Sequence, residues 1–189
     1  MSAAEQPKLF SVEEYLRDEE MRGSRHEYLG GTIHAMAGGN RRHNEIISSI
    51  FALLRPQLRE GTCKAYIETV KLHIKTSLSE FFYYPDVMVG CDPADSHDYF
   101  LEKPSILFEV LSPSTESIDR REKLLAYQTI PSLGHYVIVA QEERRIEWLQ
   151  REGNSWKVSA LTQPEDRLEF PAQGASLTLA EIYEGIAFG

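Results

Sequence analysis

Two nearly continuous apolar segments constrain the fold of this chain more than any other feature. Residues 84–89 read Tyr-Pro-Asp-Val-Met-Val and residues 106–111 read Ile-Leu-Phe-Glu-Val-Leu, so each has the length of a strand and contains one carboxylate. Runs of this kind are typical of strands that are covered on both faces. They predict two central strands in a sheet that is packed between helices.

Helices are predicted from capping boxes and from one apolar repeat. A short polar side chain followed three residues later by a carboxylate marks the start of a helix. Such boxes occur at Ser11–Glu14, Asp119–Glu122 and Thr178–Glu181, and the second predicts a helix through about Thr129. A longer helix is expected over about 43–60, where isoleucines and leucines recur at helical spacing.

The other predicted strands come from alternation and from turn residues. The glycine pair at 30–31 indicates a hairpin, and residues 70–75 alternate like a strand with one face in water. Further strands are expected at 136–139, 145–150 and 155–161, and a polar loop over 90–103. Since no repeat or linker interrupts this order, we expect one α/β (α+β) domain over residues 1–189, with a central mixed sheet, flanking helices and extra β-hairpins.

The composition fits such a domain and limits the cellular compartment in which we expect the protein. With 42% hydrophobic and 26% charged residues, the chain is neither disordered nor fibrous. No apolar run approaches the roughly 20 residues that cross a bilayer, and the N-terminus lacks the order of a signal peptide. We therefore expect a cytoplasmic protein with no membrane partner. Cys63 and Cys91 lack a metal-binding spacing, so we expect both to be thiols.

The net charge limits how the chain could meet a nucleic acid. A formal charge of −9 gives no long-range attraction to a polyanion, and salt screens exposed charges beyond about 8 Å. Any such contact must depend on a local group of cations. The segment Asn40-Arg41-Arg42-His43 at the start of the long helix is one candidate, and a solvated basic loop is the alternative.

The carboxylates of the two apolar strands, Asp86 and Glu109, are the main chemical signal. Burying an ionised carboxylate costs several kcal/mol unless a cation compensates it. Each could instead turn to water at a strand end or form a buried salt bridge, but finding two in neighbouring apolar strands favours a shared site. Lys123 and Tyr127 lie four residues apart, and thus on one face, of the helix predicted to follow Glu109. A solvated lysine on a polar helix face is the alternative for Lys123.

These residues also resemble those of a known family. The segments Tyr84-Pro85-Asp86-Val87 and Phe108-Glu109-Val110-Leu111-Ser112-Pro113-Ser114-Thr115, followed by Asp119, Lys123 and Tyr127, resemble the Uma2 family, also called DUF820. The resemblance extends from about Glu27 to Val139. It implies a restriction-endonuclease-like fold and membership of the PD-(D/E)XK nuclease superfamily, and thus a metal-dependent endonuclease that hydrolyses phosphodiester bonds in DNA.

One position departs from the superfamily pattern. A lysine is expected two residues after the acidic residue, but Leu111 stands there. The resemblance implies that Lys123, on the next helix, takes over this task. It also implies metal ligands in Asp86, Glu109 and the Val110 carbonyl, and a further catalytic carboxylate in Glu27, for which an exposed hairpin residue is the alternative. His43 and Tyr127 match supporting or substrate positions, although a helix-capping histidine is the more common case.

The chemistry explains why these residue types are needed. Mg²⁺ can generate a nucleophile from water and neutralise phosphoryl charge while taking only one or two carboxylates, and Mn²⁺ is an alternative ion. Lys123 would orient the water or stabilise the transition state. Two other functions stay open: a non-catalytic dimeric binding or regulatory module on a nuclease scaffold, and hydrolysis of a small phosphorylated metabolite. By analogy with nucleases that pair to cut two strands, we expect a homodimer.

Overall fold

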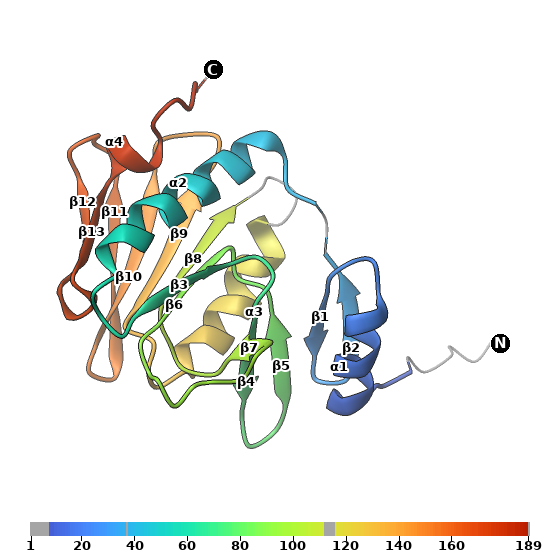
Figure 1. Ribbon diagram of the computed structural model, residues 1–189. Coiled ribbons are helices and arrows are strands. Elements are labelled where there is room, and N and C mark those ends of the chain that lie inside the picture. The colour runs from blue at the N-terminus through green and yellow to red at the C-terminus, as the bar shows by residue number, and fades with distance from the viewer. Residues whose placement is uncertain (1–7, 37, 112–115, 189) are drawn as a thin grey trace.

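The fold is seen in a computed structural model that describes residues 8–36, 38–111 and 116–188, with residues 116–121 described by their backbone alone. Within these ranges the strands form a six-stranded sheet, a five-stranded sheet and a two-stranded sheet. Helices lie on both faces of the larger sheet (Figure 1). This confirms the predicted α/β (α+β) class with a mixed sheet between helices.

The six-stranded sheet has the order β11-β10-β9-β8-β6-β3. Its strands are β3 (Lys64–Ile67), β6 (Val87–Gly90), β8 (Pro104–Leu111), β9 (His135–Ala140), β10 (Ile146–Glu152) and β11 (Ser155–Leu161). β8 pairs with β9 in parallel and with β6 antiparallel, so the sheet is mixed. The run 106–111 lies inside β8, whereas β6 begins only at Val87, so Tyr84, Pro85 and Asp86 of the predicted strand precede it. Val87, Met88, Val89, Leu107 and Phe108 are each at most 1% exposed.

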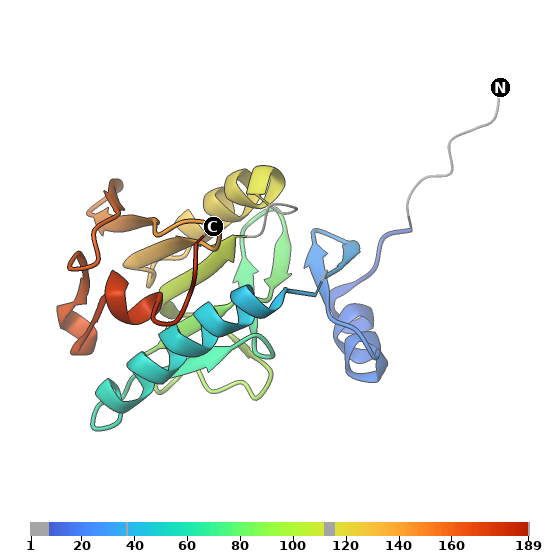
Figure 2. The same cartoon turned by 90° about the horizontal axis from the view of Figure 1, so that it is seen from above.

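Two helices cover opposite faces of this sheet (Figure 2). Helix α2 (Arg41–Gln57) packs Ile46, Ile50 and Leu54 against alternate residues of β6 and β8. Helix α3 (Glu116–Gln128) packs Tyr127 against the other set, which includes Met88, Leu107 and Leu111. Because side chains alternate between the two faces of a strand, Glu109 projects toward α3, like Leu107 and Leu111.

The five-stranded sheet has the order β2-β1-β5-β4-β7 and carries helix α1 (Val12–Met21). Its strands are β1 (His26–Leu29), β2 (Thr32–Ala35), β4 (Lys71–Lys75), β5 (Glu80–Tyr83) and β7 (Phe100–Leu101). Gly30 and Gly31 join β1 to β2 with φ of 56° and 104°, the left-handed region that favours glycine. A cluster of Tyr15, Tyr28, Phe82 and Phe100 holds α1 to this sheet.

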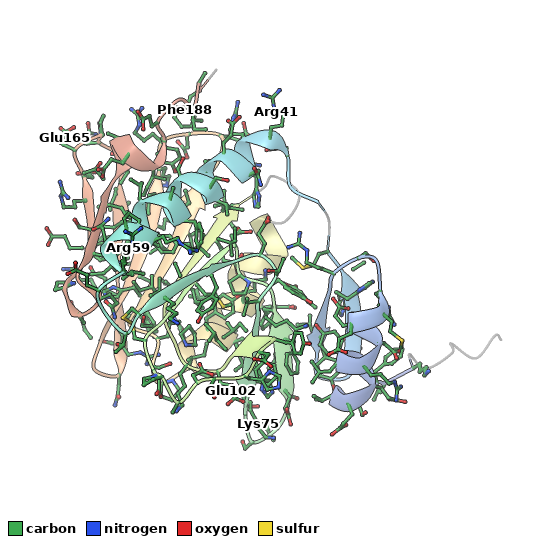
Figure 3. The ribbon with its side chains drawn as sticks, in the orientation of Figure 1. Arg41, Arg59, Lys75, Glu102, Glu165 and Phe188 are labelled. Atoms are coloured by element: carbon green, nitrogen blue, oxygen red, sulfur yellow. A yellow bond between two sulfur atoms is a disulfide. The ribbon has the colours of Figure 1, made fainter. Side chains whose placement is uncertain are left out.

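The remaining elements complete the face of the large sheet that α2 covers. Strands β12 (Arg167–Phe170) and β13 (Ala175–Thr178) flank the 3₁₀ turn η1 (Pro171–Gln173), and the short helix α4 (Leu179–Ile182) follows. Leu168, Leu177 and Leu179 belong to the same apolar cluster as α2. Figure 3 shows Arg41 and Arg59 near opposite ends of α2, with Lys75 and Glu102 together at an edge of the smaller sheet.

Several local predictions are confirmed. Ser11 and Thr178 cap α1 and α4 through complete capping boxes. The hairpin of β10 and β11 turns at Gly153 and extends the large sheet. The long helix begins at Arg41, two residues before its predicted start.

Three local predictions are wrong. Helix α3 begins at Glu116, so position 119 lies inside the helix and not at its start. The strand at 71–75 has its polar face in water only at Lys75, since Lys71 and His73 are 6% and 8% exposed. The loop at 90–103 contains the short strand β7, which pairs with β4.

The prediction that both cysteines are thiols is also wrong. Lys64 pairs with Gly90 at the end of the β3–β6 ladder, so Cys63 and Cys91 follow as neighbours across the strands. The structure joins them in a disulfide. The 28 residues between them hid this proximity in the sequence.

Candidate active site

The site begins where β6 and β8 approach the smaller sheet. Val87 pairs with Phe108, and one further step along the same antiparallel register places Asp86 opposite Glu109. The Val110 amide donates a hydrogen bond of 2.6 Å to Asp86 Oδ2. The two strands thus bring both carboxylates to one end of the ladder.

Glu109 lies in a buried environment on the α3 side of the sheet. The Tyr127 hydroxyl donates a hydrogen bond of 2.7 Å to Glu109 Oε1, and both residues are buried. Burial raises the pKa of Tyr127 well above its ordinary value, and the charge of Glu109 adds to this. Tyr127 is therefore a permanent hydrogen-bond donor that fixes the orientation of Glu109.

Lys123 brings its amine to the same place, one helical turn before Tyr127. Its Nζ lies 3.1 Å from Glu27 Oε1 and 3.5 Å from Glu109 Oε1. The Tyr83 ring centroid is 5.8 Å from Nζ. Since Lys123 is only 7% exposed, the alternative of a solvated surface lysine is excluded.

Glu27 reaches the site from the smaller sheet. It lies on β1, whose neighbour Tyr28 pairs with Phe82 of β5. Its side chain is 14% exposed, which excludes the alternative of an exposed hairpin residue. The sequence predicted Glu27 and Lys123 separately, and the structure brings them into contact.

His43 lies in the first turn of α2 on the opposite side of Asp86. The Asn40 side chain caps this helix by accepting a hydrogen bond from the His43 amide. The ring Nε2 is 3.4 Å from Asp86 Oδ2. Burial works to lower the pKa of His43, but the hydrogen bond and charge of Asp86, helped by Glu68 and the Val110 backbone, raise it. His43 thus positions Asp86 and does not cap the helix with its side chain.

The neighbouring arginine of the basic segment is engaged elsewhere. Arg42 Nη1 contacts Glu142 Oε2 at 2.5 Å and donates to the Gln141 carbonyl at 3.3 Å. This contact ties the start of α2 to the segment after β9. Sequence reasoning did not find Glu142 as a partner, because about a hundred residues separate the two.

The electrostatics of the site show an excess of negative charge. Burial raises the pKa of Glu109 to about 8, and repulsion from Asp86 and Glu27 adds to this, while Lys123 and Tyr127 oppose it. The effect of Asp86 on Glu109 indicates that their charges share one region. An added cation would favour the ionised form of Glu109.

This shift predicts how stability depends on pH. Because the folded-state pKa of Glu109, about 8, lies above its ordinary value of 4.5, folding takes up a proton in this interval. The contribution of Glu109 to the free energy of unfolding is therefore fully present below about pH 4.5, and it is lost as the pH rises toward 8. In EDTA, the free energy of unfolding of Glu109→Gln should fall less between pH 5 and pH 8 than that of the parent protein. Urea denaturation at both pH values measures this, and equal slopes would contradict the assignment.

The acidic residues of this cluster are of the kind that hold a hard cation. In the described part of the chain, no group of three His, Cys, Asp or Glu residues is arranged to hold a metal ion. Mg²⁺, however, needs only one or two carboxylates and keeps several waters. Glu27 Oε1 is buried and makes no hydrogen bond to the residues described, in spite of its ion pair with Lys123. Two carboxylates in contact with Lys123, and a third at the neighbouring strand end, therefore fit a hard cation held mainly through water.

Comparisons with known proteins agree with this fold. The chain is 36% identical over 183 residues to the "Uncharacterized protein slr1290" of Synechocystis sp., covering 96% of this chain and 95% of that protein. It is 30% identical over 167 residues to "Uncharacterized protein sll1609" of the same organism, covering 86% and 93%. Among solved structures, a "putative nuclease belonging to DUF820" from Anabaena variabilis superposes with a TM-score of 0.73 at 12% identity, over 94% of this chain and 99% of the other.

The fold is thus that of an α+β protein with mixed sheets and flanking helices, and it is shared with a solved protein of DUF820. The Uma2 family, described as "Putative restriction endonuclease", matches residues 12–180. The chain belongs to the Uma2 family, which confirms the resemblance found in the sequence. In the described residues, none of the helices has the length and apolar character needed to span a bilayer.

Proposed function

We propose that this protein is a Mg²⁺-dependent endonuclease that hydrolyses phosphodiester bonds in DNA. The observation that carries the proposal is the position of Lys123 Nζ, 3.1 Å from Glu27 and 3.5 Å from Glu109, beside the strand end that holds Asp86. One acidic residue in β8, a second directly before β6 and an amine from the following helix provide the groups that metal-assisted hydrolysis uses. The family description and the solved DUF820 relative support the nuclease class.

In this mechanism each residue has a definite task. Asp86 and Glu109, with the Val110 carbonyl, would hold the ion, which supplies an activated water and neutralises phosphoryl charge. His43 and the Val110 amide hold the Asp86 carboxylate, and Tyr127 holds Glu109. Lys123 stabilises the charge that develops on the phosphoryl oxygens, and Glu27 keeps the ammonium in place.

The proposal includes a cytoplasmic homodimer. Cutting both strands of a duplex needs two sites, and one chain provides one such cluster among its described residues. The hairpin of β10 and β11 is the interface we propose, since β11 forms an edge of the large sheet. Edge strands present unpaired backbone groups to a partner.

Plasmid nicking tests the proposed activity. We expect nicked circles to accumulate in millimolar Mg²⁺ and to be absent in EDTA, since the ion must activate the water. Mn²⁺ should replace Mg²⁺. The readout is gel electrophoresis of supercoiled DNA over time. Equal nicking in EDTA, or none with either ion, would refute the proposal.

A second candidate, a non-catalytic binding or regulatory module, is favoured by one observation. Lys123 and Tyr127 already contact Glu109 without an ion, at 3.5 Å and 2.7 Å, so the cluster has internal partners of its own. Calorimetric titration with Mg²⁺ separates the two functions. Binding that disappears in Glu109→Gln supports the enzyme, whereas no ion binding by the parent protein supports the module.

A further inference from the structure

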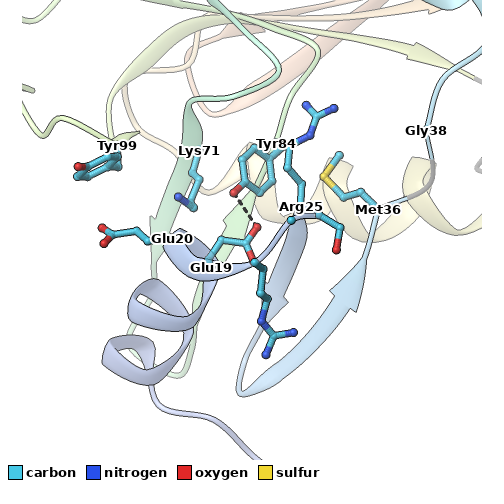
Figure 4. A pocket seen from close by; sticks show the side chains of 11 residues that line it. Glu19, Glu20, Arg25, Met36, Gly38, Lys71, Tyr84 and Tyr99 are labelled. Carbon is cyan, nitrogen blue, oxygen red and sulfur yellow. Dashed lines mark hydrogen bonds between the residues drawn. The ribbon is translucent and has the colours of Figure 1, made fainter.

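A cavity lined by none of the residues of the acidic cluster lies elsewhere on the smaller sheet. It is a cavity of about 630 Å³ between the end of α1, the start of β4 and the segment before β1, within the size range of small-ligand pockets. Figure 4 shows six of the side chains that line it: Glu19, Glu20, Arg25, Lys71, Tyr84 and Tyr99.

Lys71 is the unusual residue of this cavity. It is 6% exposed, yet its ammonium makes no hydrogen bond or ion pair within 8–36, 38–111 and 122–188. Its Nζ lies 5.5 Å from the Tyr84 ring centroid and 5.9 Å from that of Tyr99. Burial lowers the pKa of Lys71, and attraction to Glu19 and Glu20 opposes this. A desolvated ammonium beside two rings and an open cavity is suited to an incoming anion.

The buried carboxylate of the cavity, Glu19, is occupied by other donors. Glu19 Oε1 accepts hydrogen bonds from the Tyr84 hydroxyl at 2.9 Å and from the His26 amide at 2.7 Å, and Oε2 lies 3.1 Å from His26 Nδ1 (Figure 4 draws the Tyr84 bond). These contacts hold Glu19 against β1. Its charge is thereby shared with three donors and is not paired directly with Lys71.

Two further residues line the cavity near Lys71 and Tyr84. Arg25 donates a hydrogen bond of 2.7 Å to the Glu68 carbonyl, and Figure 4 draws the Tyr84 ring between its guanidinium and Lys71. Tyr99 lies at the rim of the cavity and is 54% exposed. Its carbonyl accepts a hydrogen bond of 3.0 Å from the backbone amide of Lys71, so the two residues are neighbours. An exposed ring of this kind is a stacking surface for a nucleobase.

We propose that this cavity binds the phosphate group of a nucleotide through Lys71, with its base packed against Tyr99. The cavity connects to the acidic cluster through the backbone, because Arg25 binds the Glu68 carbonyl and the Glu68 amide donates to the Asp86 carbonyl at 3.3 Å. The nucleotide has two possible sources. It is either a free mononucleotide or part of a substrate strand next to the cleaved bond, and the second source rests on the proposed nuclease function.

Calorimetry on the full chain in EDTA tests this site without cleavage. The probes are 2′-deoxyadenosine 5′-monophosphate, its nucleoside 2′-deoxyadenosine, and a short single-stranded oligodeoxynucleotide. We expect the monophosphate to bind and the nucleoside to bind at least about tenfold more weakly, since the phosphate carries the charge-assisted contact. Lys71→Met should weaken monophosphate binding by about tenfold or more.

The matched control is Lys75→Met. Lys75 lies on the same strand and bears the same charge, but its side chain is 67% exposed and pairs with Glu80. Figure 3 shows it at the edge of the sheet. We expect monophosphate affinity within about twofold of the parent, because net charge alone is a weak, screened effect. Equal losses in both variants would overturn the proposal.

Folding is controlled by two measurements. Lys71→Met removes a buried charge that has no ion-pair partner among the described residues, so its Tm should equal or exceed that of the parent. Tyr99→Ala changes a rim residue and should also weaken monophosphate binding, while Tyr99→Phe should not. Parent-like binding by both Lys71→Met and Tyr99→Ala would overturn the proposal.

The oligonucleotide identifies the source of the phosphate. If Lys71→Met weakens the binding of both the monophosphate and the oligonucleotide, the site holds a nucleotide of the strand. If it weakens the binding of the monophosphate alone, the ligand is a free mononucleotide. Asp86→Asn separates this inference from the nuclease proposal, since it should retain monophosphate binding. Loss of monophosphate binding in Asp86→Asn but not in Lys71→Met would overturn the cavity and leave the nuclease proposal standing.

Discussion

Asp86→Asn should abolish plasmid nicking, with a fall in rate of at least about 10³-fold. The substitution preserves the size of the side chain and leaves an amide oxygen that can accept from the Val110 amide, as Asp86 Oδ2 does at 2.6 Å. It removes the charge on which ion binding depends. Initial nicking rates in Mg²⁺ and a thermal melt of the same preparation measure the effect.

Asp92→Asn is the matched control for this experiment. Asp92 follows the other end of β6, its side chain is 37% exposed, and it pairs with Lys103. We expect parent-like nicking, because an exposed ion pair contributes little to stability and lies outside the acidic cluster. Full activity in Asp86→Asn, or equal loss in Asp92→Asn, would show that the activity does not arise from the proposed site.

The parts of the fold that the sequence predicts well are those in which one local pattern decides the structure. β6 and β8 follow from continuous apolar runs, and both are buried. α1 and α4 follow from capping boxes whose hydrogen bonds are both present. In each case a few neighbouring residues contain the whole signal.

The errors have a common physical cause, which is contact with distant parts of the chain. The alternation of the sequence predicts that Lys71 and His73 face water. In the structure, His73 lies between the carboxylates of Glu80 and Glu102 and stacks on Phe82, with ring centroids 4.3 Å apart. Paired polar groups can be buried, and sequence alternation does not reveal the partners. The Cys63–Cys91 disulfide was missed for the same reason.

The candidate site contains residues that a local sequence pattern reveals and contacts that it does not. Asp86 and Glu109 could be predicted, because a carboxylate inside an apolar strand is an anomaly that needs an explanation. The contact between Lys123 and Glu27 could not, since it joins α3 to the smaller sheet over almost a hundred residues. The connection Ser112-Pro113-Ser114-Thr115 lies outside the described residues.

Lys123→Met should lower the nicking rate by about 10²–10³-fold, the usual effect of removing one group that stabilises transition-state charge. The same change should lower the free energy of unfolding by about 3–5 kcal/mol, because Glu27 and Glu109 lose the cation between them. Nicking assays and urea denaturation measure the two effects separately.

A double variant separates the catalytic role of Lys123 from its structural role. Adding Glu27→Gln to Lys123→Met removes one of the uncompensated carboxylates, so most of the lost stability should return. The activity should stay at the level of the single variant, since the amine is still absent. Lys123→Arg keeps the charge but not the point-like ammonium, and we expect it to fold with partial activity. If the double variant regains activity along with stability, Lys123 only holds the fold together, and the lysine has no part in the chemistry.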